Sequence, residues 1–133
     1  EFVVRDKDSF TSQQDVLDYF EQYKQAQSKD TYGGKTPEET LGLFVDALKK
    51  GDTTLASKYF VLDKQKEMGD NFKKGLKNGS IDLLLSVLNK EKIASKLSEN
   101  NYRFTTVDAN GVAEFNFDLI LNELTNIWKI ESL

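Results

Sequence analysis

Two periodicities divide the chain, a helical one before Asn100 and an alternating one after it. In the first part apolar residues recur every three or four positions, which is typical of amphipathic helices. In the second part apolar and polar residues alternate, which is typical of antiparallel strands with one buried face. The pattern therefore predicts an α+β fold, with N-terminal helices packed on a curved C-terminal antiparallel sheet.

The clearest helix signal begins at Thr36. Thr36 suits the N-cap, Pro37 the first helical position and Glu39 the third, which together make a capping box. An apolar stripe follows at Leu41, Phe44, Val45 and Leu48. Gly51 is the expected C-terminal stop. We therefore predict a helix over residues 37–50.

The first 35 residues are read as an N-terminal extension with one amphipathic helix. Phe2-Val3-Val4 resembles a short edge strand or a loose tail. Thr11 or Ser12 can cap a helix whose apolar positions are Val16, Leu17, Phe20 and Tyr23. The polar, glycine-containing stretch 30–35 reads as a loop. Residues 36–133 then form the α+β domain.

Three further helices are predicted between residues 52 and 88. Asp52 and Asp63 are candidate N-caps, and Ser80 starts the third helix after the turn Asn78-Gly79. Gly69 and Gly75 each weaken a helix by about 1 kcal/mol relative to Ala, so we expect the middle helix to be mobile or irregular. The spacing of Ile93 and Leu97 predicts a last turn of helix.

The alternating part predicts a three-stranded meander. Asp108-Ala109-Asn110-Gly111 is a hairpin turn, and residues 124–126 form a second turn. Tyr102, Phe104, Phe115, Phe117, Leu119, Trp128 and Ile130 share one face. Arg103, Glu114, Asn116, Asp118, Lys129 and Glu131 share the other. We therefore expect an aromatic face against the helices and a charged face in solvent.

Two segments carry a family resemblance. The stretch TPEETLGLFVDALKKGDTTLASKYF (36–60) resembles the opening helices of the nuclear transport factor 2-like (cystatin-like) superfamily, and NIWKIE (126–131) is similar to its last strand. The resemblance implies a curved sheet wrapped on a long helix, forming a cone with a pocket. It also implies kinship with uncharacterised bacterial exported or lipid-anchored proteins, and so a place outside the cytoplasm. The helical stretch 63–97 departs from that family, where a strand pair is often found.

The amino-acid composition argues against several classes of function. The net charge is −4, which argues against nucleic-acid binding. Lys73, Lys74 and Lys77 are read as a solvated helix face and not as a phosphate patch. The chain has neither Cys nor His, so thiolate chemistry and the commonest general base are missing. No apolar run reaches the roughly 20 residues of a transmembrane helix. We expect no cofactor and no metal.

Candidate site residues come from the predicted aromatic face. The predicted pocket lining is Phe44, Tyr59, Tyr102, Phe104, Phe117 and Trp128. The same residues also suit a filled core, since a sheet face must be packed in any case. No carboxylate is placed inside by the pattern, because Glu114 and Asp118 alternate with inward residues, and no catalytic residue is predicted.

The leading hypothesis is a non-enzymatic binding or accessory domain with an unknown ligand or protein partner, acting outside the cytoplasm. The alternative is a small-molecule enzyme or carrier that uses an aromatic-lined cone pocket. A third hypothesis is an interaction module that forms a homodimer through its sheet.

Overall fold

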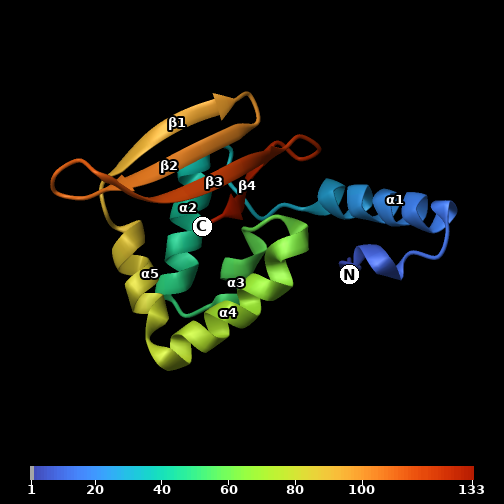
Figure 1. Ribbon diagram of the computed structural model, residues 1–133, viewed down its shortest axis with the longest axis horizontal. Coiled ribbons are helices and arrows are strands. Elements are labelled where there is room, and N and C mark those ends of the chain that lie inside the picture. The colour runs from blue at the N-terminus through green and yellow to red at the C-terminus, as the bar shows by residue number, and fades with distance from the viewer. Residues whose placement is uncertain (1) are drawn as a thin grey trace.

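In the computed structural model, which describes residues 2–133, the helices precede a single sheet (Figure 1). The α-helices are α1 (Gln13–Lys29), α2 (Pro37–Lys49), α3 (Thr53–Lys58), α4 (Gln65–Asn78) and α5 (Ser80–Leu88), with short 3-10 helices η1 (Lys7–Ser9) and η2 (Leu62–Lys64). The strands are β1 (Lys92–Ser98), β2 (Asn101–Val107), β3 (Ala113–Asn122) and β4 (Ile127–Ser132). The predicted α+β class and the order of its two parts are confirmed.

The sheet has four antiparallel strands in the order β1-β2-β3-β4. This is one more than the pattern predicted, because β1 occupies the place of the expected last helical turn. A spacing of four residues, as between Ile93 and Leu97, is even and therefore suits one face of a strand as well as a helix. Pairing with β2 along most of its length decides in favour of the strand. The helical stretch predicted to reach Leu97 ends at Leu88.

The sheet arches over α2 but stays open (Figure 1). It is neither closed nor strongly curled, because β1 and β4 lie at opposite edges and do not pair. The closed cone implied by the family resemblance is therefore not formed by residues 2–133. An open sheet leaves the space beside α2 accessible from the β1 side, which matters for the site described below.

The core lies between the sheet and the helices. Its fully buried side chains include Phe44 of α2, Phe60 and, from the sheet, Phe117, Leu119 and Ile130. The rings of Phe44 and Phe60 meet edge to face, with their centroids 5.4 Å apart, a favoured arrangement for aromatic pairs. We call this side of the sheet the helix-covered face and the other side the outer face. The prediction of an aromatic inner face is confirmed for this central part.

The inner face is not covered along its whole length. Phe115 shares the alternation of Phe117 but is 48% exposed. The hairpin between β2 and β3 extends beyond the helices (Figure 1), and at this end Lys90 Nζ lies over the Phe115 ring, 5.9 Å from its centroid. Alternation therefore predicts the face correctly at Phe117, while the register shift between Thr105 and Val107 interrupts it toward the hairpin and the reach of the helices decides burial.

The predicted caps are largely confirmed. Thr36 Oγ1 accepts from Glu39 N, Asp52 accepts from Leu55 N, and Ser12 Oγ accepts from Asp15 N. The predicted cap at Asp63 is wrong, because the chain makes the 3-10 turn η2 there and α4 begins two residues later.

Helix α4 is regular from Gln65 to Asn78, contrary to the expectation of a mobile or irregular segment. Its two glycines are buried where neighbouring segments approach. A Cβ on Gly75 would lie 2.9 Å from Ser80 Oγ and 3.0 Å from an Ile81 carbon, and one on Gly69 would meet Ser57 at 3.4 Å. The glycines therefore permit close packing with α3 and α5, which offsets their low helix propensity.

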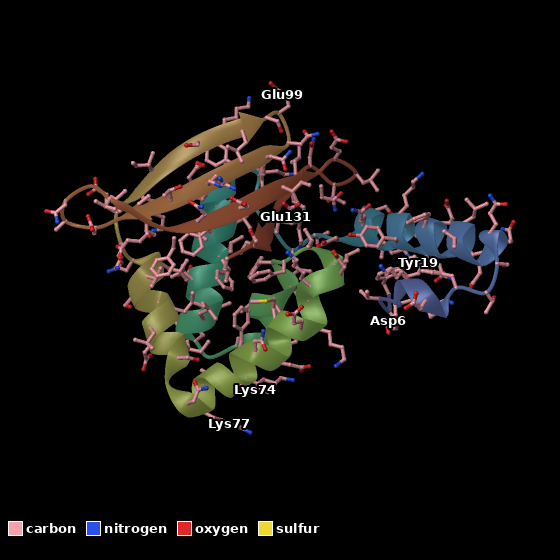
Figure 2. All side chains as sticks on the ribbon, in the orientation of Figure 1. Asp6, Tyr19, Lys74, Lys77, Glu99 and Glu131 are labelled. Carbon is pink, nitrogen blue, oxygen red and sulfur yellow. The ribbon has the colours of Figure 1, made fainter. Side chains whose placement is uncertain are left out.

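Residues 2–29 form an N-terminal arm that extends to the side of the sheet–helix body (Figure 1). The predicted edge strand at Phe2–Val4 is absent. Phe2 instead packs on α1, with ring centroids 5.3 Å from Tyr19 and 5.2 Å from Tyr23. Tyr19 points from α1 toward the segment that precedes it (Figure 2). No residue of α1 is buried, and Phe20 is 62% exposed.

Candidate functional site

The six residues predicted to line a pocket are distributed through the core. Phe44, Tyr59, Phe104 and Phe117 are buried members of the hydrophobic core, and Tyr102 and Trp128 pack against it partly buried. The structure brings three of them together on the sheet. The ring of Tyr102 lies 5.3 Å from that of Phe104 and 6.2 Å from that of Trp128, measured between centroids. Phe44 packs separately with Phe60 and Phe72.

Only Phe104 of these six lines either of the two cavities described below. Their packing with one another resembles a filled core more than the wall of a pocket. Burial raises the pKa of the Tyr59 hydroxyl, with a smaller contribution from Tyr32. A raised pKa leaves even less of the phenolate form at neutral pH, so Tyr59 is not poised to act as a general base.

Asp118 lies on the outer face, as the alternation predicts, opposite Arg103 of β2. Asp118 forms an ion pair with Arg103, with Nε 2.7 Å from Oδ1, and this hydrogen bond lowers the pKa of Asp118 despite partial burial. Glu114 pairs with Lys90, with Nζ 3.0 Å from Oε1. Lys73, Lys74 and Lys77 are exposed, and the labelled Lys74 and Lys77 point away from the body (Figure 2).

The main candidate site is a groove between α2, the end of α5 and the strands β1 and β2, which we call the helix–sheet groove. It has a volume of about 390 Å³. Leu41, Val45, Leu88, Ala94 and Phe104 contribute its apolar lining, with Glu38, Gly42, Asp46 and Lys92 completing it. The volume lies within the range of small-molecule pockets in proteins. The groove exists because the open sheet extends past α2 without a further helix beneath β1.

The charged groups of this groove are divided between its two walls. Glu38 and Asp46 come from α2, and neither forms an ion pair within residues 2–133. Lys92 comes from β1, and its Nζ donates to the carbonyls of Leu88 and Lys90 at the end of α5. Burial lowers the pKa of Lys92. The groove therefore has an apolar floor with acidic groups on the helix wall.

The two edges of the sheet differ in their free backbone groups. In antiparallel pairing, successive residues direct their N–H and C=O groups alternately toward the two sides of the strand. On β4 the outward groups are bonded: Trp128 N donates to Gly34 O at 2.9 Å, and Ile130 N donates to Tyr59 O at 2.8 Å. Ile130 O accepts from Val61 N at 2.9 Å. The β4 edge is therefore closed by the chain itself.

The β1 edge is open. Val107 N donates to Glu91 O at 3.1 Å, and these two residues lie opposite each other in the β1–β2 register. The alternation then directs the N–H and C=O groups of Lys92, Ala94 and Lys96 away from the sheet. No other residue in the described range 2–133 forms a backbone hydrogen bond with Ala94 or Lys96 on that side. The same three residues place their side chains on the helix-covered face, beside the groove.

A buried ion pair joins the arm to the body. Lys129 Nζ lies 2.9 Å from Asp30 Oδ2, and the two side chains are only 3% and 5% exposed. Nζ also donates to the carbonyls of Tyr32 at 2.6 Å and Lys58 at 2.5 Å. Burial lowers the pKa of Lys129, and Asp30 opposes that effect. Each proton of the ammonium thus has an acceptor, as a buried charge requires.

Sequence reasoning misplaced this pair. Lys129 alternates with Trp128 and Ile130, so the pattern put it on the solvent face, and Asp30 lay in a loop. The segment 30–34 crosses the outer face at β4 and covers the lysine. The alternation of apolar and polar residues within β4 cannot predict that a segment distant in the sequence buries Lys129.

A second cavity of about 350 Å³ lies where the arm meets β3, β4 and η2. Four of its five charged side chains, all but Glu131, already have a partner. Lys129 pairs with Asp30, Asp63 accepts from Tyr23 Oη at 3.4 Å, and Lys64 donates to Glu131 O. Burial, followed by the charge of Asp63, raises the pKa of Tyr23 to about 12. This cavity therefore offers a ligand few free polar groups.

No family model, curated protein or solved structure matches this chain. The resemblance to the nuclear transport factor 2-like superfamily therefore stays a prediction. None of the helices within residues 2–133 is long and apolar enough to cross a membrane. Within the same range, no three acidic side chains gather as a metal site would require.

Proposed function

We propose that this protein is a non-enzymatic binding domain whose helix–sheet groove accepts an apolar group of its ligand or partner. The observation that carries the proposal is a groove of about 390 Å³ with an apolar lining, in which Ala94 is exposed, Val45 is half-buried, and Leu41 and Phe104 belong to the core below. Burying one leucine-sized side chain in such a site contributes about 1.5–3 kcal/mol, which is useful to a binding protein.

The packing of the predicted aromatic residues supports binding in this open groove over binding in an enclosed cone. Phe44 and Phe117 are fully enclosed by other core residues, so a ligand there would have to displace them. The carboxylates on the groove wall, Glu38 and Asp46, serve as selectivity elements in the proposal, since they disfavour an anionic group on that side.

Gly42 allows a direct test. It lies in the groove lining, and a Cβ added there would meet nothing within 4 Å. Gly42→Leu should therefore fill the groove without disturbing α2, while Gly42→Ala should leave most of it open. Nile red, a neutral dye whose fluorescence rises in apolar surroundings, serves as the probe.

We expect saturable Nile red binding to the wild type, little change for Gly42→Ala, and a loss of roughly tenfold in affinity for Gly42→Leu, equivalent to about 1.4 kcal/mol. Thermal unfolding provides the folding control. Gly42→Ala should be more stable by up to about 1 kcal/mol, since Ala is the better helix former. Absence of saturable binding, or equal binding by all three proteins, would contradict the proposal.

We also propose that the domain acts outside the cytoplasm, and this part rests on the family resemblance alone. Fractionation of cells that express the complete gene tests it, and recovery in the cytoplasmic fraction would contradict it.

A further inference from the structure

We infer that the open β1 edge binds an extended peptide segment of a partner protein as a fifth, antiparallel strand, with acidic residues opposite Lys92 and Lys96 and an apolar residue opposite Ala94. This inference deepens the proposed function, because the apolar residue would enter the helix–sheet groove. Addition of a strand to an exposed sheet edge is a recurrent mode of peptide recognition.

The backbone gives the first argument. Unpaired edge groups are ready to pair with another strand, and the chain closes the β4 edge through Gly34, Tyr59 and Val61 but leaves the outward groups of Ala94 and Lys96 unbonded within residues 2–133. An incoming antiparallel strand would exchange hydrogen bonds with these residues.

The register gives the second argument. Ala94 pairs with Phe104 on the helix-covered face, and both residues line the groove. A partner residue directly opposite Ala94 must also point to the helix-covered face, because paired residues share a face. A small alanine at this position leaves the neighbouring apolar surface accessible to that side chain.

Charge gives the third argument and selects the partner. Lys92 and Lys96 flank Ala94 on the same face. Lys92 Nζ donates only to backbone carbonyls, and Lys96 pairs with the exposed Glu99 at 3.4 Å, so acidic side chains opposite them would add a cross-strand pair at Lys92 and compete with an exposed pair at Lys96. Glu38 and Asp46 on the groove wall disfavour an acid at the central position. The motif is therefore acidic, any, apolar, any, acidic.

The same charges disfavour a second copy of this chain as the added strand. Antiparallel pairing of two β1 strands about Ala94 would place Lys92 of each copy opposite Lys96 of the other, and like charges directly opposite are destabilising. Lysines on an edge strand commonly prevent such self-pairing. A partner strand with acidic residues opposite Lys92 and Lys96 avoids this repulsion between like charges.

The probe is the palindromic peptide acetyl-Thr-Glu-Thr-Leu-Thr-Glu-Thr-amide, titrated into isotope-labelled protein and followed by amide chemical shifts. We expect shifts at Lys92, Ala94 and Lys96 and slower hydrogen exchange of their amides. The peptide with Lys in place of both Glu should bind about tenfold more weakly, since two cross-strand pairs change sign. The peptide with an N-methylated Leu loses one backbone donor and should also lose about tenfold.

Two protein variants complete the test. Lys96→Glu should reverse the preference between the Glu and Lys peptides. Ala94→Pro removes an outward N–H without removing a bond to β2, a position where edge strands tolerate proline, and Ala94→Ser is its control. If Ala94→Pro does not fold, the N-methylated peptide with wild-type protein gives the same information.

Equal binding of the N-methylated and parent peptides, or shifts that avoid β1, would overturn strand addition. A dimer in sedimentation that Ala94→Pro dissociates, with no peptide binding, would overturn it in favour of a second copy. Because Nile red binding depends on Gly42 and needs no strand addition, it would survive either result. Failure of this inference is therefore distinguishable from failure of the proposed function.

Discussion

The buried ion pair between Lys129 and Asp30 is the most informative place to perturb the fold. We consider Lys129→Met, which keeps the length of the side chain and removes the charge. In the native protein the ammonium bonds to Asp30, to Tyr32 O and to Lys58 O. The variant leaves the Asp30 carboxylate buried, with Tyr32 N as its remaining donor at 3.0 Å.

The magnitude follows from that arrangement. Removing one partner of a buried ion pair costs about 3–5 kcal/mol, because the other charge stays buried without compensation. The two carbonyls that lose their donor add to the cost, since an orphaned buried polar group is itself destabilising by about 1–3 kcal/mol. These contributions overlap, and we expect a total loss of about 4 kcal/mol. For a chain of this length that lowers the Tm by about 15 °C.

Urea unfolding followed by fluorescence measures this loss directly, because Trp128 is the only Trp in the chain and adjoins Lys129. Lys90→Met is the matched control. Lys90 and Glu114 are 39% and 29% exposed, so breaking their pair should cost less than about 1 kcal/mol. A loss for Lys129→Met no larger than that of the control would refute the buried pair. The double variant Asp30→Asn/Lys129→Met should cost less than the sum of the two single changes.

Two further measurements test the packing of the linker and the arm. Gly33→Ala should destabilise the fold by about 1–3 kcal/mol, because its Cβ would lie 2.4 Å from Trp128 O. Gly69→Ala is the control: its nearest contact would be at 3.4 Å, so it should be neutral or stabilising by up to about 1 kcal/mol. Equal effects of the two changes in urea unfolding would contradict this prediction. Tyr23 should ionise near pH 12 in ultraviolet titration, and Asp63→Asn should lower that value. Because the folded pKa is the higher one, the contribution of Tyr23 to stability is complete below pH 10 and is lost as the pH rises toward 12; ionisation of Tyr23 at an ordinary pKa would argue against its burial.

The sequence predicts most of the fold, because local rules decide most of its elements. The capping box at Thr36, the stop at Gly51 and the hairpin at 108–111 depend on neighbouring residues alone. The strand β1 escaped prediction, since a spacing of four residues does not distinguish a helix from a strand and only pairing with β2 resolves it. The regularity of α4 was not predicted for a related reason. Helix propensity treats Gly69 and Gly75 as destabilising, but it does not include the close packing of α3 and α5 against them.

The candidate site is less predictable than the fold. The sequence places Phe104 on the inner face correctly, but the groove that it lines depends on where α2 and α5 end relative to β1. No periodicity contains that information. The predicted aromatic lining consists of residues that the core requires for packing, and the helix–sheet groove is lined mainly by small and aliphatic residues that carry no chemical signature.

Two lysines show where pattern reasoning fails. Lys96 lies in the edge strand β1, in a stretch for which the spacing of Ile93 and Leu97 predicted a turn of helix, and Lys129 lies in the edge strand β4, where its alternation with Trp128 and Ile130 predicted a solvent position. The side chain of Lys96 is 59% exposed and that of Lys129 is 3% exposed. The difference comes from residues 30–34 and 59–61, which bond to the β4 edge and cover one lysine, while no segment among the described residues bonds to the backbone of Ala94 or Lys96 on the side of β1 that faces away from β2. The β4 edge, which other segments of the chain cover, is buried, whereas the β1 edge has backbone hydrogen-bonding groups that remain available to a partner strand. This contrast is why we place the partner at β1.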